Sequence, residues 1–198
     1  MKHETGIVGS SFPGQITIRE GYSEFFNGLM DIVRKASADM GGVDGQTGEN
    51  LRSYVMDWLG NHPLLDFNEY SDTKYIRSYI GRCPETHWEA IVMSWKRGNT
   101  TTIHGHPQFA AYNFADGIFR LEIFEKVSET GARKIKTVEI DRPGGFFALG
   151  DSEDFDNHIH RITCLSDTGH SLHVYSDDAL KGRVYEEVQY VFRNGSSQ

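Results

Sequence analysis

Cysteine is scarce in this sequence, with only Cys83 and Cys164 among 198 residues. Two cysteines cannot form a disulfide framework, so we expect free thiols and a cytoplasmic protein. Long hydrophobic runs are also missing, and a transmembrane helix, which needs about 18 or more consecutive apolar residues, is not expected. The segment 1–14 lacks the basic and then apolar pattern of a secretory signal, so no signal peptide is expected either.

Basic residues are in the minority: 20 lysines and arginines face 28 aspartates and glutamates, which gives a formal net charge of −8. Non-specific binding to nucleic acid depends on positive surface patches, so we expect no nucleic-acid partner. The missing hydrophobic runs predict no membrane partner. The length predicts a single domain over residues 1–198. The expected state is a monomer or a weak homodimer, which no feature of the sequence fixes. Histidine is the unusual residue type, because nine occur and several are closely spaced.

The first third of the chain has helical periodicity. Over residues 19–40, apolar residues recur three or four positions apart, which predicts a helix that Gly41-Gly42 ends. A second helix is predicted over residues 47–60 by the same spacing. A third, short helix is predicted over residues 70–80, so that residues 1–82 form a mostly helical part.

After residue 86 the hydrophobic period changes to two, which is typical of β-strands. Asp116-Gly117 lies between two such runs and predicts a β-hairpin. No helical pattern separates the runs, which argues against a parallel sheet with crossover helices. The pattern therefore predicts a mainly β fold, a sandwich or barrel over residues 86–193. Its strands are expected over residues 88–95, 100–106, 108–114, 118–126, 134–140, 146–149, 158–165, 170–175 and 184–192.

Two histidines separated by one residue, His104-Gly105-His106, form the sharpest local motif. Residues i and i+2 of a strand point to the same face, so the two imidazoles lie side by side and can bind one cation. Gly105 is expected to leave the opposite face uncrowded. A third ligand must come from another strand, where His160 is the candidate and His158 the rival.

A second strand places Ser171, His173 and Tyr175 on one face, with Leu172 and Val174 on the other. If the first face points into a barrel, Ser171 can orient His173, and His173 can orient the Tyr175 hydroxyl. A half-buried strand whose polar face meets solvent would show the same alternation.

These motifs together resemble a known family. Their order and spacing are similar to those of cysteine dioxygenase and related thiol dioxygenases of the cupin superfamily, in Tyr75-Ile76-Arg77, Trp95, Gly98 to His106, His160-Arg161 and Ser171 to Tyr175. The first cupin motif is matched at Gly98, His104, His106 and Gly117, with Ala110 or Ala111 in place of the usual glutamate. The resemblance covers about residues 75–175.

The resemblance implies a cupin jelly-roll barrel with the N-terminal helical segment packed on its outside. It implies a mononuclear Fe(2+) ion held by His104, His106 and His160. The reaction it implies oxidises a small thiol carboxylate with O2 to the sulfinic acid, with L-cysteine as the first substrate and mercaptopropionate as the second.

The resemblance also assigns roles to residues beyond the metal ligands. Tyr175 would be the active-site tyrosine, with His173 and Ser171 behind it. Three further residues would meet the substrate: Arg77 would bind its carboxylate, with Arg82 as the fallback, and Tyr75 and Trp95 would line the pocket. Three neutral imidazoles leave the cation its full charge, which favours a thiolate, and an arginine fork matches a carboxylate.

The sequence departs from the family at several positions. Gly105 replaces a common aspartate, and Ser176-Asp177-Asp178 stands where cysteine-specific enzymes often have two prolines. The alanine at position 110 or 111 excludes a thioether crosslink to Tyr175. The alternative function is a non-catalytic or differently metallated cupin, a small-molecule binding or sensor module, since three histidines also suit zinc.

Overall fold

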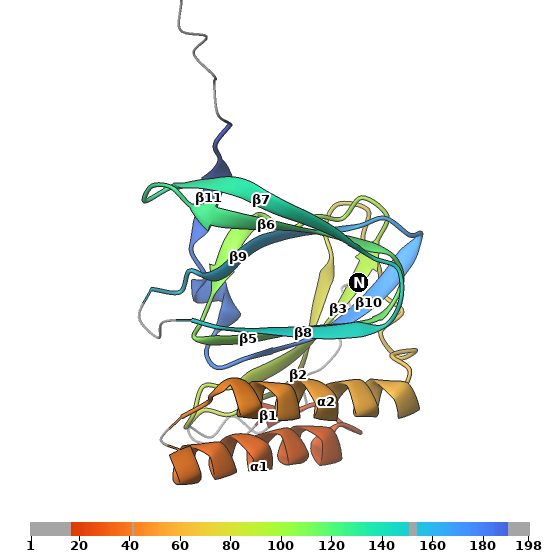
Figure 1. Ribbon diagram of the computed structural model, residues 1–198. Helices are drawn as coiled ribbons and strands as arrows, with labels where there is room; N and C mark the ends of the chain where they lie inside the picture. Colours follow the sequence, from red (N-terminus) through yellow and green to blue (C-terminus); the bar gives the residue numbers. More distant parts are fainter. Residues whose placement is uncertain (1–16, 41, 151–153, 190–198) are drawn as a thin grey trace, which may run out of the picture.

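The computed structural model describes residues 17–40, 42–150 and 154–189. Most elements are strands, which form two sheets facing one another, and two helices lie outside them (Figure 1). The elements in chain order are β1 (Thr17–Ile18), α1 (Ser23–Met40), α2 (Gly45–Asn61), β2 (Ile76–Arg82), β3 (Glu89–Lys96), β4 (Ile103–His106), β5 (Phe109–Asp116), β6 (Phe119–Lys126), β7 (Gly131–Ile140), β8 (Gly144–Leu149), β9 (Asn157–Cys164), β10 (Thr168–Tyr175), the 3₁₀ turn η1 (Ala179–Lys181) and β11 (Val184–Glu187).

The strand order is that of a jelly-roll barrel. One sheet has the order β1-β2-β3-β10-β5-β8, and the other has the order β11-β4-β9-β6-β7. In the second sheet β11 pairs with both β4 and β7, which closes that sheet into a ring. The predicted fold class, a mainly β jelly-roll barrel with helices packed on its outside, is confirmed.

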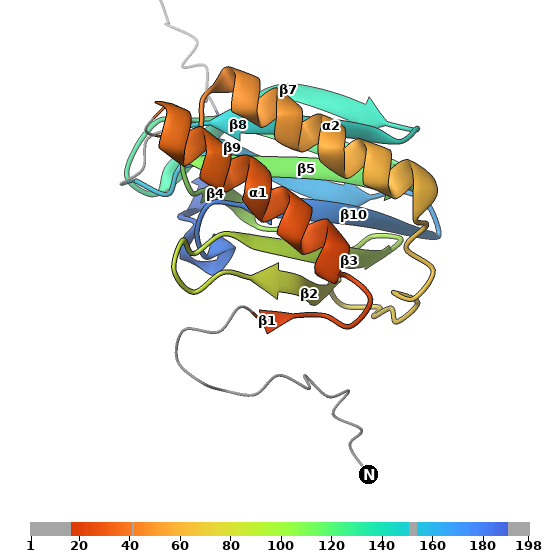
Figure 2. The same ribbon diagram turned by 90° about the horizontal axis from the view of Figure 1, so that it is seen from below.

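Helices α1 and α2 cover the outer face of the six-stranded sheet (Figure 2). The predicted helical stripe of α1 is buried there through Phe25, Phe26 and Leu29, and Val92 and Leu172 meet it from the sheet. A cap fixes the start of α2, because the backbone N–H of Thr47 donates to the Asp44 carboxylate over 2.8 Å. Both predicted helices are therefore confirmed. Among the described residues, no helix has the length and apolarity that crossing a membrane requires.

The third predicted helix, over residues 70–80, is wrong. The segment forms β2 instead, which pairs antiparallel with β3 so that Arg77 lies opposite Met93. Ile80 is fully buried against the helices, whereas Arg77 faces the barrel interior. Pairing with a neighbouring strand decides this segment, and a short apolar pattern cannot reveal such pairing. The helical part of the chain therefore ends at Asn61 and not at residue 82.

The predicted hairpin at Asp116-Gly117 is also wrong. Gly117 does turn the chain, with a φ of +87° that favours glycine. However, β5 pairs with β8 and β10, whereas β6 pairs with β7 and β9, so the turn carries the chain from one sheet to the other. The remaining predicted strands are present, but the last one ends at Glu187, so residues 188–189 are not strand, and residues 190–192 lie outside the described residues.

The barrel interior is divided between a packed end and a polar end. Aromatic rings fill the packed end, where Phe119 lies 4.8 Å from Phe114 and 5.7 Å from Trp95, measured between ring centroids. Apolar side chains from both sheets complete this core, among them Ile91, Met93, Leu121, Ile140 and Ile162. The histidines predicted to bind metal occupy the other end.

A network of charged side chains ties four strands together on the outer face of the second sheet. Arg161 of β9 donates hydrogen bonds to Glu122 of β6 over 2.7 Å and to Glu187 of β11 over 3.1 Å. Lys134 of β7 donates to Glu122 over 2.8 Å. The hydrogen bond from Arg161 and then that from Lys134 lower the pKa of Glu122 from 4.5 to about 2.

This network predicts an acid-sensitive contribution to stability. Because the pKa of Glu122 is depressed in the folded state, its contribution is complete above pH 4.5 and is lost as pH falls towards about 2. We expect roughly 2 kcal/mol of unfolding free energy to be lost over this range, and Glu122→Gln to remove that loss. Denaturant unfolding of the metal-free protein at several pH values measures it. Identical pH slopes for the two proteins would contradict the prediction.

Candidate metal centre

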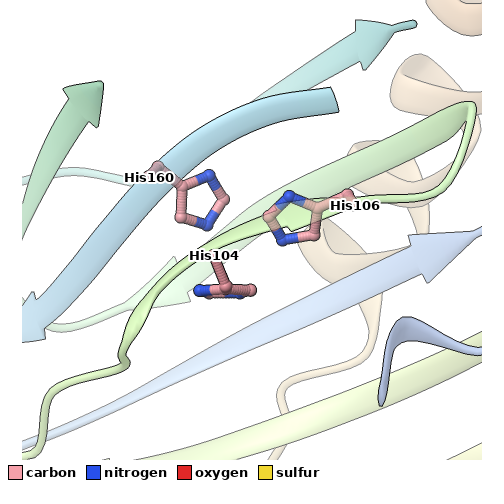
Figure 3. Close-up of side chains that lie close together, drawn as sticks. All are labelled: His104, His106 and His160. Carbon is pink, nitrogen blue, oxygen red and sulfur yellow. The ribbon is translucent and has the colours of Figure 1, made fainter. Parts of the chain in front are cut away.

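Three histidines meet at the polar end of the barrel, and their rings face one another (Figure 3). His104 and His106 come from β4 and His160 from β9, where His104 and His160 lie directly opposite in the antiparallel ladder. The ring centroids are 4.5 Å apart for His104–His106, 4.5 Å for His106–His160 and 5.0 Å for His104–His160. Their ligand atoms all lie within 4.8 Å of one another. Among the described residues, no carboxylate or thiolate joins this group.

Hydrogen bonds at Nδ1 leave the Nε2 atoms of two ligands free. His104 Nδ1 lies 2.9 Å from the carbonyl of Thr102, and His106 Nδ1 lies 3.1 Å from the carbonyl of Asn157. A carbonyl only accepts, so both Nδ1 atoms carry the proton and both Nε2 atoms keep a lone pair. His106 Nε2 is buried with no partner among the described residues. A metal ion would satisfy this atom, so the donor set fits a bound cation.

Burial keeps the three imidazoles neutral. It lowers the pKa of His104, and burial together with the neighbouring histidines lowers the pKa values of His106 and His160 well below 6.5. The neutral ring is the form that binds a metal, so the ligands need lose no proton at neutral pH.

Gly105, between the two ligands of β4, has a crowded opposite face, contrary to our expectation. A Cβ atom there would lie 2.4 Å from the Cα of Asp156 and 2.7 Å from the carbonyl oxygen of Phe155. The Gly105 N–H also donates to the carbonyl of Arg183 over 2.8 Å. Glycine is therefore required because two other backbone segments approach the strand closely, and not because the face is open.

This close approach predicts a large effect for a single methyl group. Gly105→Ala should destabilise the protein by roughly 2–4 kcal/mol, because backbone atoms must move to make room. Thermal unfolding measures the loss. Gly60→Ala is the matched control, because a Cβ at Gly60 has no atom within 4 Å. Equal melting temperatures for Gly105→Ala and the wild type would contradict the prediction.

A cavity of about 130 Å³ opens beside the histidines. Two of the three ligands, His104 and His160, line it, so metal positions left open by the protein would face this space. Among the described residues of the lining, Arg77 is the one with a permanent charge, and none is an aspartate or a glutamate. The other lining residues are Tyr75, Arg77, Met93, Thr101, Thr102, Ile162, His173, Tyr175, Ala179, Leu180, Gly182 and Val184.

Arg77 reaches the cavity from β2, and no described residue forms an ion pair with it. Its Nε and Nη2 atoms are buried with no hydrogen-bond partner among the described residues, and its guanidinium carbon lies 5.9 Å from the ring centroid of Tyr79. Arg82, the fallback, instead contacts Asp178 over 3.4 Å and Glu89 over 4.0 Å and does not line the cavity. Arg77 is half-buried, and leaving two of its buried nitrogen atoms without a partner is costly, so the guanidinium is placed to receive an anion.

Ser171, His173 and Tyr175 form one chain of hydrogen bonds inside the barrel. Trp95 Nε1 donates to Ser171 Oγ over 2.9 Å, and Ser171 Oγ lies 2.7 Å from His173 Nε2. His173 Nδ1 lies 2.8 Å from the Tyr175 hydroxyl. Ser171 is fully buried, and His173 Nε2 is the acceptor that its hydroxyl proton has among the described residues. His173 then carries its own proton on Nδ1 and donates it to the Tyr175 hydroxyl.

Because the Tyr175 hydroxyl accepts the hydrogen bond from His173, its own proton is free to point into the cavity. Burial, and then the charge of Arg77, lower the pKa of His173 to about 3, which keeps that ring neutral. Burial raises the pKa of Tyr175 far above its usual value of 10, so the phenol keeps its proton. Tyr175 is therefore a hydrogen-bond donor whose direction the buried chain fixes.

The other predicted pocket residues divide between two positions. Tyr75 lines the cavity, whereas Trp95 does not reach it: Trp95 packs behind Tyr75, with ring centroids 4.5 Å apart, and holds Ser171. The Trp95 position thus differs from the prediction. The ladder places Ala110, and not Ala111, opposite Tyr175 inside the barrel.

Sequence reasoning missed Tyr112, which lies beside the metal ligands. Its ring centroid is 4.6 Å from that of His160 and 5.2 Å from that of His106, and burial raises its pKa well above 10. The alternation of β5 carries the signal, since Ala110, Tyr112 and Phe114 face the interior together. No local motif marks the position otherwise.

No known family model matches the chain, and no curated protein matches its sequence. A solved protein with a double-stranded beta-helix domain from Klebsiella pneumoniae subsp. pneumoniae MGH 78578 has 12% identity and a TM-score of 0.47, over 63% of this chain and 96% of that one. An RmlC-like cupin from Shewanella frigidimarina NCIMB 400 has 13% identity and a TM-score of 0.38, over 50% and 72%.

An oxalate oxidase structure is also similar, with 10% identity and a TM-score of 0.43, over 58% of this chain and 56% of that one. Similarity at these levels concerns the backbone. The chemistry of this chain must therefore be argued from its own side chains.

Proposed function

We propose that this chain is an iron(II)-dependent thiol dioxygenase of the cysteine dioxygenase type. Its substrate would be a small thiol carboxylate, with L-cysteine first and mercaptopropionate second. One observation carries the proposal: a cavity beside three converging histidines is lined by two of them, by Arg77 and by the end of the Ser171–His173–Tyr175 chain.

His104, His106 and His160 would hold the iron through their Nε2 atoms. Bound iron(II) supplies a positive charge that favours a thiolate and a redox centre that reacts with dioxygen. In the overall reaction R–SH and O2 give R–SO2H, so both oxygen atoms join the sulfur, which loses the four electrons that dioxygen gains.

Arg77 would bind the carboxylate at the other end of the substrate. The guanidinium fork can donate two hydrogen bonds to a carboxylate, and its Nε and Nη2 atoms have no partner among the described residues. Size agrees with this assignment, because a cavity of roughly 150 Å³ holds benzene, and about 130 Å³ suits a molecule of similar size.

Tyr175 would donate its hydroxyl proton to the same carboxylate. The hydrogen bond from His173 fixes the direction of the phenol, and its raised pKa keeps it a donor at neutral pH. Tyr75, directly before β2, would cover the bound molecule. Trp95 and Ser171 would act through His173, by holding its ring in place.

Oxygen uptake tests the proposal. Protein loaded anaerobically with iron(II) should consume O2 with L-cysteine or mercaptopropionate and form the sulfinate, and should be much slower with cysteamine, which has no carboxylate. Bound iron with no uptake for any of the three thiols would refute the dioxygenase. Metal analysis of protein purified without added metal tests the alternative, because a zinc-filled site with no oxygen uptake fits a binding module.

We also expect a single domain over residues 1–198, a monomeric or weakly dimeric state, and a cytoplasmic location. Size-exclusion chromatography with light scattering tests the second of them directly.

A further inference from the structure

His158, the rejected rival for the third ligand, has an unusual backbone conformation. Its φ of +46° lies in the left-handed region, which non-glycine residues rarely adopt because it strains the backbone. The residue before it is held firmly: the Asn157 amide donates to the carbonyls of Pro107, Gln108 and Ala148 over 3.1–3.2 Å. The surrounding structure therefore imposes this conformation on a histidine where glycine would be free of strain.

The imidazole of His158 contacts the third ligand at its outer nitrogen. His158 Nδ1 lies 3.3 Å from His160 Nδ1, and the two ring centroids are 5.3 Å apart. His104 and His106 meet main-chain carbonyls at the same atom. Of the three histidines, His160 is thus the one whose Nδ1 contacts a side chain. If His158 accepts a hydrogen bond at this contact, the proton of His160 is on Nδ1 and its Nε2 is free to bind a metal.

We propose that His158 is a positioning residue that accepts the Nδ1–H of His160 and so directs the Nε2 lone pair of the third ligand at the metal. The inference rests on the metal site of the proposed function. Because His158 Nδ1 must then be an acceptor, His158 carries its own proton on Nε2 and stays neutral. The strained backbone persists because glycine, which would relieve the strain, has no acceptor to offer.

The geometry also separates this role from that of a fourth ligand. His158 meets His160 at the nitrogen that faces away from the other two ligands if Nε2 binds the metal. The group whose ligand atoms converge consists of His104, His106 and His160, and His158 is not part of it. His158 therefore acts through His160.

Two substitutions separate strain from positioning. His158→Gly removes both the strain and the acceptor, so the metal-free protein should unfold at the same or a higher temperature while metal binding weakens roughly 10- to 100-fold. His158→Asn keeps an acceptor, because the asparagine Oδ1 occupies the place of the histidine Nδ1 along the side chain, and asparagine tolerates the left-handed region. His158→Asn should bind metal within a few-fold of the wild type.

His87 provides a matched control. It also has a left-handed backbone, with a φ of +64°, but it is exposed and lies outside the metal centre. His87→Gly should raise the unfolding temperature of the metal-free protein and leave metal affinity unchanged.

The measurement is the dissociation constant of cobalt(II) and of iron(II), each added as the metal alone against a competing chelator, with the cobalt absorption spectrum as a report on ligand geometry. His158→Gly should show weaker binding and an altered spectrum, and His158→Asn should restore both. Equal affinities for His158→Gly and the wild type, no rescue by His158→Asn, or no metal binding by the wild type would each overturn the proposal. Metal binding without oxidation of any thiol would refute the dioxygenase alone, since no thiol enters this assay.

Discussion

Replacing His106 with alanine should weaken iron(II) binding by more than roughly a hundredfold and abolish oxygen uptake with thiols. Even partners outside the ligand set change metal affinity 10- to 100-fold, and a ligand matters more. His106 is fully buried, and its Nε2 has no partner among the described residues, so no nearby group can replace it. Two imidazoles would remain, with one fewer protein donor than the site needs.

The control for this variant must exclude misfolding, because His106 contacts the core. Its ring lies 5.2 Å from that of Tyr112, so removing it leaves a cavity worth roughly 1–3 kcal/mol of stability. Unfolding of both proteins without metal measures that loss separately. His62→Ala, an exposed histidine stacked on Trp58, should bind iron like the wild type. A folded His106→Ala protein with unchanged iron affinity would refute the three-histidine site.

Replacing Arg77 with methionine should have opposite effects on activity and stability. Losing two charge-assisted hydrogen bonds to the substrate carboxylate should lower kcat/KM for L-cysteine and mercaptopropionate by roughly 100- to 1000-fold, about 3–4 kcal/mol. Unfolding without substrate should be unchanged or shifted to higher temperature, because the variant removes a cation with two buried, unpartnered nitrogen atoms.

Arg82, five residues along the same strand, provides the comparison. It contacts Asp178 and Glu89 outside the cavity, so Arg82→Met should lower stability and change kcat/KM much less. Cysteamine is the control substrate, because it has no carboxylate for Arg77 to bind. A fall in kcat/KM that is equal for cysteamine and for the carboxylates would show that Arg77 does not recognise the carboxylate.

The features predicted best from the sequence are those that a single strand determines. His104 and His106 share a face because side chains alternate along a strand, and the same rule places Ser171, His173 and Tyr175 together. The choice of His160 over His158 came from the resemblance, and the structure places its imidazole in the converging group. Its strand neighbour His104 is more than fifty positions away in the chain, and local spacing carries no information about such a pairing.

The features that sequence reasoning missed depend on contacts between distant segments. The sequence identifies Arg77 as a pocket residue, but the helix predicted around it is wrong, because the segment becomes a strand only by pairing with β3. The sequence predicts that the turn at Gly117 joins two paired strands of a hairpin, whereas the turn connects the two sheets. The role of His158 depends on a φ angle and one hydrogen bond, and neither leaves a trace in residue spacing.

The three converging histidines and Arg77 stand on different sheets. The histidines come from β4 and β9 of the ring-closed sheet, and Arg77 comes from β2 of the other. Under the proposed function, the gap between the sheets would therefore limit how many carbons can separate sulfur from carboxylate in a bound molecule. Core side chains at the packed end of the barrel, such as Phe114 and Phe119, help to set that gap. Altered preference for chain length could thus arise from repacking the distant aromatic end while every polar side chain around the ion stays the same.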